Sequence, residues 1–220
     1  MTRNPTFSEI VWPNDPDSHE LAIQWAGEIT VQALNWIWRA FDVLYSDYLS
    51  GIDMRQPLEQ LERDLVRHHH QQIIVLYARE TDGFASFTPH HEWPEMESRS
   101  EASAQPPSND IAFVATSSNQ RWALAVEAKV LPTKGELYRY MNDVNDKFVT
   151  GIASPFVDVG AMIGYLLCDD AETVFAGIEK RLKQKLESPP EFASRAHRTS
   201  QHERAHAPDI CLHHMIMVCV

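Results

Sequence analysis

Two acidic side chains and a lysine stand at the ends of two short apolar runs in DIAFVATSSNQRWALAVEAK, residues 110–129. Asp110 opens the first run, and Glu127 and Lys129 close the second. Two carboxylates a few ångströms apart raise one carboxyl pKa sharply unless a cation lies between them. Mg²⁺ prefers a few carboxylate oxygens and keeps several waters. We therefore expect Asp110 and Glu127 to bind Mg²⁺ or Mn²⁺.

Lys129 is expected beside these acids, because side chains alternate with a period of two along a strand and residues 127 and 129 share a face. A lysine there can orient or help deprotonate an attacking water and offset negative charge developing on phosphorus. A structural alternative stays open, in which Asp110 caps a strand and Glu127 pairs with Lys129 at a sheet edge.

The elements that must position these residues follow from hydrophobic periodicity. Residues 88–109 and 188–208 are polar and predict a surface loop and a linker. Helices are predicted over residues 17–51 and 57–80, beyond Pro132 to Phe148, and from Asp169 or Asp170 to Leu186. Strands are predicted over residues 84–87, 111–116, 122–131, 159–168 and 209–220.

This order of elements indicates an α/β fold, with a mixed central sheet flanked by helices. A chain of 220 residues, 44% of them hydrophobic, is long enough for one substantial core. We expect a single globular unit, in which an N-terminal helical part (1–83) packs on a core (84–220).

The net charge of -12 comes from 31 acidic against 19 basic side chains, so the chain repels polyanions at long range. A local basic patch, metal ions or a partner would have to overcome that repulsion. No apolar signal core and no run of about 18 apolar residues occurs, which predicts a soluble, cytoplasmic protein without a membrane partner. Three cysteines without framework spacing fit a reducing compartment.

The series Asp110, hairpin, Glu127-Ala128-Lys129 resembles the motif of the PD-(D/E)xK nuclease superfamily, and the element order is similar to its restriction-endonuclease-like core. The resemblance implies that Asp110 and Glu127 bind the divalent metal and that Lys129 serves the nucleophilic water. It also implies an acid from the first core helix, for which Glu62 is the preferred candidate and Glu28 the other.

A second motif of the family's exonuclease branch, Gln-xxx-Tyr, has its spacing matched by Glu136 and Tyr140. The segment from residue 179 to 206 carries more basic than acidic side chains and is the best candidate for phosphate contact. Its alternative is an ordinary solvated helix face and loop. Its candidate nucleic-acid contacts are Lys180, Lys183, Arg198, His202 and Arg204. His202 and Arg204 reach the site if the final strand lies next to strand 122–131.

These features predict a metal-dependent nuclease that hydrolyses phosphodiester bonds in DNA, with RNA as the alternative substrate. They also predict that it depends on a protein partner or a homo-oligomer. The resemblance implies a bacterial anti-phage defence or DNA-processing setting. One alternative is an inactive nuclease-fold protein acting as a binding or scaffold subunit. Another is a zinc-stabilised interaction domain, suggested by the loose spacing of His202, His206, Cys211 and His213.

Overall fold

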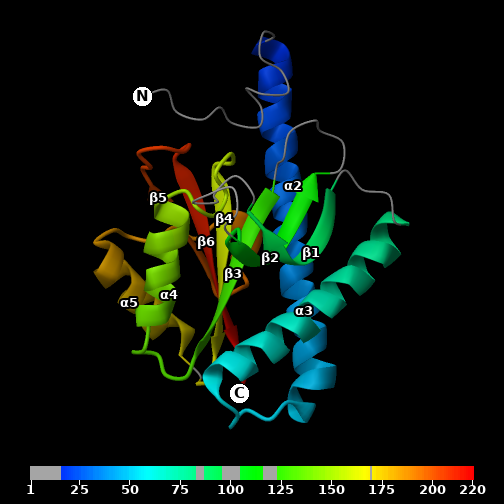
Figure 1. Cartoon of the computed structure of the whole chain (residues 1–220), viewed down its shortest axis with the longest axis vertical. Coiled ribbons are helices and arrows are strands. Elements are labelled where there is room, and N and C mark those ends of the chain that lie inside the picture. The colour runs from blue at the N-terminus through cyan, green and yellow to red at the C-terminus, as the bar shows by residue number, and fades with distance from the viewer. Residues whose placement is uncertain (1–15, 83–86, 96–104, 116–122, 169) are drawn as a thin grey trace.

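A six-stranded sheet with helices on both faces forms the centre of the computed structural model (Figure 1). The structure describes residues 16–82, 87–95, 105–115, 123–168 and 170–220, with side chains from Gly27 onward. The strand order is β1-β2-β3-β4-β6-β5. The strands are β1 (Phe87–Pro94), β2 (Ser108–Ala115), β3 (Ala123–Leu131), β4 (Val159–Leu166), β5 (His197–His202) and β6 (Ile210–Val218).

The helices fall into two groups along the chain. The first group is α2 (Pro16–Val43), continued by η1 (Leu44–Tyr48) and η2 (Leu49–Gly51), and then α3 (Leu58–Thr81). The second group is α4 (Tyr138–Asp143), continued by η4 (Val144–Val149), and α5 (Ala171–Leu182), with the short η5 (Pro190–Phe192) before β5. Strand β4 pairs in parallel with β3 and β6, and the other pairs are antiparallel.

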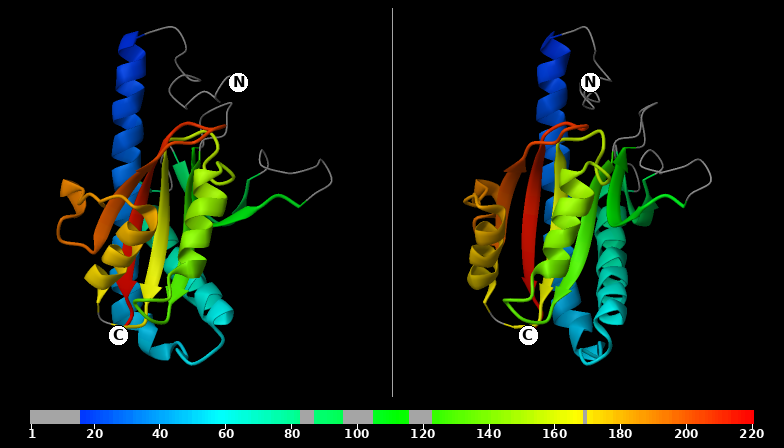
Figure 2. Two further views of the ribbon diagram at one scale, coloured as in Figure 1. Left: turned by 90° about the vertical axis from the view of Figure 1, so that its left-hand side faces the viewer. Right: turned by 60° about the vertical axis from the view of Figure 1, so that its left-hand side comes forward.

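Each face of the sheet buries its own apolar layer, because alternate residues of a strand point to opposite faces. Val126, Ala128 and Val130 of β3 pack in the core beneath α2 and α3. Ala125 and Leu131 pack in the core beneath α4 and α5. The result is three layers, with the two helix pairs on opposite sides of the sheet (Figure 2). Residues 127 and 129 belong to the α4 side.

The position of η4 over the sheet depends on close packing against β4. A Cβ at Gly160 would lie 2.5 Å from the Phe148 ring, so only glycine leaves room for that ring. Phe148 and Val144 are buried. Their burial holds the α4–η4 segment against β3 and β4, and with it the polar residues Asp143 and Lys147.

The predicted α/β class, with a mixed sheet, flanking helices and an N-terminal helical part, is confirmed. Residues 88–109 are not one loop, because β1 occupies most of the first third and β2 begins at Ser108. The linker 188–208 likewise contains β5. Strand β4 separates β6 from β3, so the expected adjacency of the final strand to strand 122–131 is wrong. The hairpin turn at 117–120 lies outside the described residues.

None of the helices in the described part of the chain combines the length and the apolar composition that a membrane crossing requires.

Buried histidines tie the layers together through hydrogen bonds. His69 of α3 contacts the Tyr165 hydroxyl at 2.8 Å, and His214 of β6 contacts the Tyr140 hydroxyl at 2.9 Å. Burial lowers the pKa of His69 to about 4 and that of His214 to about 3. Burial also lowers the pKa of His213 to about 4. These rings are therefore neutral in the folded protein near neutral pH.

We predict that the free energy of unfolding rises with pH between about 4 and 6.5, because the unfolded chain binds protons that these buried histidines exclude. Each such histidine adds about 1.4 kcal/mol per pH unit within that window. His214→Gln should lower this slope, measured by urea unfolding at about pH 5 and about pH 7. His206→Gln, at an exposed position, is the control. An unchanged slope in His214→Gln would contradict the prediction.

Candidate active site

Strands β2 and β3 separate next to Asp110, and carboxylates replace the ladder there. The two strands pair from Val114↔Ala123 to Ile111↔Val126. Beyond that pair, Asp110 Oδ2 accepts a hydrogen bond from the Ala128 N–H at 2.7 Å. Glu62 Oε2 of α3 accepts one from the Val130 N–H at 3.1 Å. The two acids thus satisfy backbone donors that would otherwise lack a partner, which fixes both carboxylates beside the edge of β3.

Lys129 lies among carboxylates. Its Nζ is 3.2 Å from Glu62 Oε1 and 2.9 Å from Asp143 Oδ2. Burial alone would lower the pKa of Lys129, but the negative charges of Asp110, Glu62 and Asp143 raise it above its ordinary value. The lysine is therefore firmly cationic. That state suits the expected offsetting of negative charge and disfavours the expected help in deprotonating water.

Glu127 is a carboxyl group buried in the sheet, with 1% of its surface exposed. Its Oε2 lies 2.7 Å from Lys147 Nζ, and its Oε1 has no hydrogen-bond partner among the described residues. Burial and the neighbouring charge of Asp110 raise the pKa of Glu127 to about 8, against the opposing effect of Lys147 and Lys129. Without a further cation, this group is largely protonated at neutral pH.

The α4–η4 segment supplies two polar residues that the sequence reading did not single out. Lys147 Nζ lies between Glu127, at 2.7 Å, and Asp143 Oδ2, at 3.9 Å. Asp143 and Lys147 are four residues apart and flank the apolar stripe through Tyr140, Val144 and Phe148. That spacing was a visible signal of a shared helix face. Only the rotation of the helix over β3 shows that this face meets Glu127.

The residues at the edge of β3 fit a divalent cation. Glu127 Oε1 is a buried oxygen in need of a partner, and Asp110 is the acid whose charge opposes ionisation of Glu127. A cation shared by these two carboxylates would give Glu127 Oε1 a partner and would offset the repulsion between the charges of Asp110 and Glu127. Within the described ranges, no three His, Cys, Asp or Glu side chains form a metal-binding group. Two carboxylates completed by waters and phosphate oxygens suit Mg²⁺.

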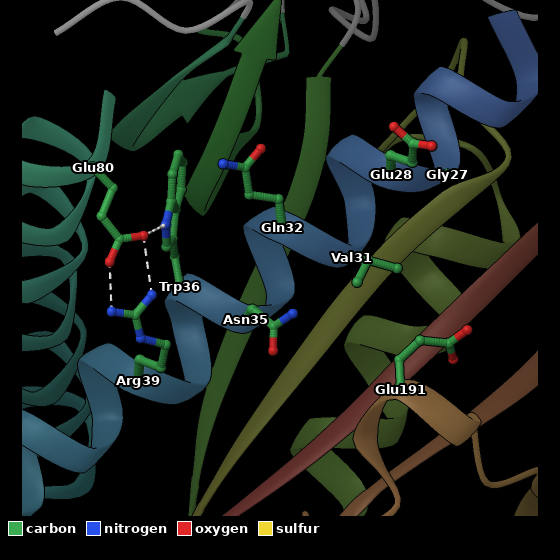
Figure 3. Close-up of a pocket in the computed structure, with 9 residues that line it drawn as sticks. All are labelled: Gly27, Glu28, Val31, Gln32, Asn35, Trp36, Arg39, Glu80 and Glu191. Carbon is green, nitrogen blue, oxygen red and sulfur yellow. Dashed lines mark hydrogen bonds and ion pairs between the residues drawn. The ribbon is translucent and has the colours of Figure 1, made fainter. Parts of the chain in front are cut away.

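Of the two candidate helix acids, one belongs to this cluster and the other lies apart from it. Glu62 belongs to it, as its bonds to Lys129 and Val130 show. Glu28 lines a separate cavity of about 670 Å³ along α2, together with Gln32 and Asn35 (Figure 3). In that cavity Glu80 accepts a 2.8 Å hydrogen bond from Trp36 Nε1.

The pair from the Gln-xxx-Tyr spacing is also divided. Glu136 is exposed and precedes α4. Tyr140 is fully buried, and its hydroxyl contacts His214 Nδ1 at 2.9 Å. The structure therefore brings neither residue into hydrogen bonding with Asp110, Glu127 or Lys129 among its described contacts.

The basic segment contributes side chains of two kinds. Lys180 and Lys183 are exposed on and just after α5, and Arg198 of β5 pairs with Glu172 at 3.1 Å. Arg204 is buried, and its guanidinium donates to backbone carbonyls, among them that of Val157 at 2.7 Å. Arg204 thus satisfies backbone carbonyls of the fold, and its nucleic-acid contact stays a prediction.

His202 and His213 are engaged in hydrogen bonds that differ from a zinc arrangement. His202 Nε2 contacts Ser200 Oγ at 2.7 Å, and His213 Nδ1 contacts His197 Nε2 at 2.8 Å. The predicted set with His206 and Cys211 forms no metal-binding group in the part of the chain that the structure describes.

Comparisons with protein-family models, with curated proteins and with solved structures give no match for this chain.

We predict that Glu127→Gln stabilises the metal-free protein increasingly as pH rises from about 5 to about 8. In the wild type the folded state keeps a proton that the unfolded chain loses above its ordinary carboxyl pKa, so stability falls across this window by up to about 4 kcal/mol. A neutral amide lacks that loss. Urea unfolding in EDTA measures the difference between variant and wild type, and exposed Glu136→Gln is the control. A difference that does not change with pH would contradict the raised pKa of Glu127.

Proposed function

We propose that this protein is a metal-dependent nuclease that hydrolyses phosphodiester bonds in DNA. One observation carries the proposal: Asp110, Glu127, Lys129 and Glu62, which come from two strands and a helix, meet at the open edge of β3. The resemblance of Asp110 and Glu127-Ala128-Lys129 to the PD-(D/E)xK motif supports the same chemistry. Acid and lysine together are the groups that phosphoryl chemistry requires.

The residues of the site divide the work by charge. Asp110 and Glu127 would hold Mg²⁺ or Mn²⁺, which when bound polarises the phosphodiester and makes water a better nucleophile. Lys129 keeps its positive charge beside these acids and would stabilise the charge that develops on the phosphate oxygens. Glu62 orients Lys129 through the 3.2 Å ion pair and is itself fixed by the Val130 N–H. Lys147 holds one oxygen of Glu127 in place.

The setting of this reaction is part of the proposal. The net charge of -12 disfavours long-range attraction to DNA. A protein partner, or a second copy of the chain, would then deliver the substrate, as in a bacterial defence or DNA-processing system in the cytoplasm.

A second candidate is a nuclease-fold subunit that binds without cutting. The observation that favours it is the engagement of the site within the fold, since Asp110, Glu62 and Lys129 all have intramolecular partners. Cleavage experiments separate the two candidates.

We predict that the protein cuts plasmid DNA in Mg²⁺ or Mn²⁺ and not in EDTA. Asp110→Asn, Glu127→Gln and Lys129→Met should each lower the rate by about 100-fold or more, the usual cost of removing a group that stabilises the transition state. Glu62→Gln should lower it less, because its amide can still accept from the Val130 N–H. Gel electrophoresis of timed reactions measures the rates.

The matched control is Glu28→Gln, which makes the same chemical change on α2 and should leave the rate unchanged. Equal cleavage by the wild type and Lys129→Met would overturn the catalytic assignment. Absence of cleavage in a folded wild type that binds DNA would favour the binding subunit.

A further inference from the structure

A cavity of about 520 Å³ opens directly beside Asp110 and Glu62. Its walls come from α3, β1, β2 and α4. Three guanidinium groups line it, from Arg63 and Arg67 of α3 and Arg139 of α4. Arg63 and Arg67 are exposed and stand one helical turn apart, so both face the same side of α3. The sequence reading did not assign any of these three arginines.

Two of the three arginines pair with a carboxylate at this wall and keep further N–H donors. Arg67 Nη2 lies 3.0 Å from Asp64 Oδ1, and Arg139 Nη2 lies 3.5 Å from Glu62 Oε2. A guanidinium has five N–H donors, so one contact with a carboxylate leaves donors for another anion. Guanidinium groups also match the geometry of phosphate oxygens.

The net negative charge of the cavity opposes the entry of an anion unless a cation binds as well. Five carboxylates line it against the three guanidinium groups, an excess of two negative charges before any cation binds. One divalent cation would offset that excess. The five acids are Glu59, Glu62, Asp64, Glu92 and Asp110.

We propose that this arginine wall binds the backbone phosphates of a DNA strand, and that it does so only together with the divalent cation. The inference rests on the proposed function, since it supplies the path by which a strand reaches Asp110 and Glu127. It also answers the difficulty posed by the acidic net charge, because attraction to DNA arises locally and only in the metal-bound state.

The basic residues of α5 and β5, which the sequence marks as candidates for phosphate contact, lie on another part of the molecule and form the rival surface in the comparison. Strand β5 is three positions from β3 in the sheet order, which corresponds to about 14 Å. Lys180 and Lys183 are exposed there, like Arg63 and Arg67 on α3. Reversing two charges in either place changes the net charge of the protein equally.

The test is binding of a fluorescein-labelled DNA oligonucleotide, followed by fluorescence anisotropy in Ca²⁺, which occupies carboxylate sites and generally supports little hydrolysis, and in EDTA. The wild type should bind at least about tenfold more tightly in Ca²⁺ than in EDTA. The double variant Arg63→Glu/Arg67→Glu should weaken binding in Ca²⁺ by about 10- to 100-fold and lower the salt slope by about two. Lys180→Glu/Lys183→Glu should change the affinity less than about threefold.

Several outcomes would overturn the proposal: equal weakening by the two double variants, wild-type affinity in Arg63→Glu/Arg67→Glu, equal binding in Ca²⁺ and EDTA, or binding of a matched RNA oligonucleotide with none of DNA. Circular dichroism checks the fold of each variant, and Arg63→Gln/Arg67→Gln replaces the charge reversal if that variant is unfolded. Arginine-dependent binding without cleavage in Mg²⁺ would uphold this inference and overturn the nuclease. Cleavage with wild-type KM in Arg63→Glu/Arg67→Glu would overturn this inference and uphold the nuclease.

Discussion

A carboxyl group buried in a sheet is costly to ionise. The arrangement of the site follows from the buried carboxyl group of Glu127. Its position on β3 is central, with β2 on one side and β4 on the other. Two lysines offset part of this cost. Lys147 of η4 places its Nζ 2.7 Å from Glu127 Oε2, and Lys129 lies two residues further along the strand. One Glu127 oxygen still has no partner among the described residues. A cation or a hydrogen-bond donor at Glu127 Oε1 would therefore stabilise the ionised carboxylate further.

The lysine that does reach Glu127 comes from a helix, so helix packing matters for chemistry as much as for stability. The glycine at position 160 admits the Phe148 ring, which seats η4 and brings Lys147 to the sheet. On the other face, Leu61 and Leu65 anchor α3 in the core and turn Glu62 toward the edge of β3. Lys147 and Glu62 are therefore held in position by buried apolar residues of the same helical segments.

Much of this could be read from the sequence, and the exceptions have physical causes. The period of two placed Glu127 and Lys129 on one face, and periodicity placed the helices. Strand β5 was missed, and the predicted strand 84–87 meets β1 only at Phe87. Both are edge strands, each pairing with one neighbour, and both carry polar residues and, in β1, Pro89. Lys147 and the arginine wall depend on how helices rotate and cross the sheet, which local patterns do not specify. The burial of Arg204 was not foreseen, because charge alone does not reveal burial.

The hydrogen bonds from Ala128 and Val130 to carboxylates also bear on how such a chain could evolve. Asp110 and Glu62 complete the backbone bonding of β3 where β2 departs, so they serve the fold whether or not a reaction takes place. A descendant that lost the proposed activity would still be under selection for a side-chain acceptor at both positions. Asparagine and glutamine would satisfy that selection, and Lys129 would still pair with Asp143 and the Ala128 carbonyl. Loss of the carboxylate charge at positions 110 and 62, with the amide acceptor kept, is therefore the change that would record a change of role.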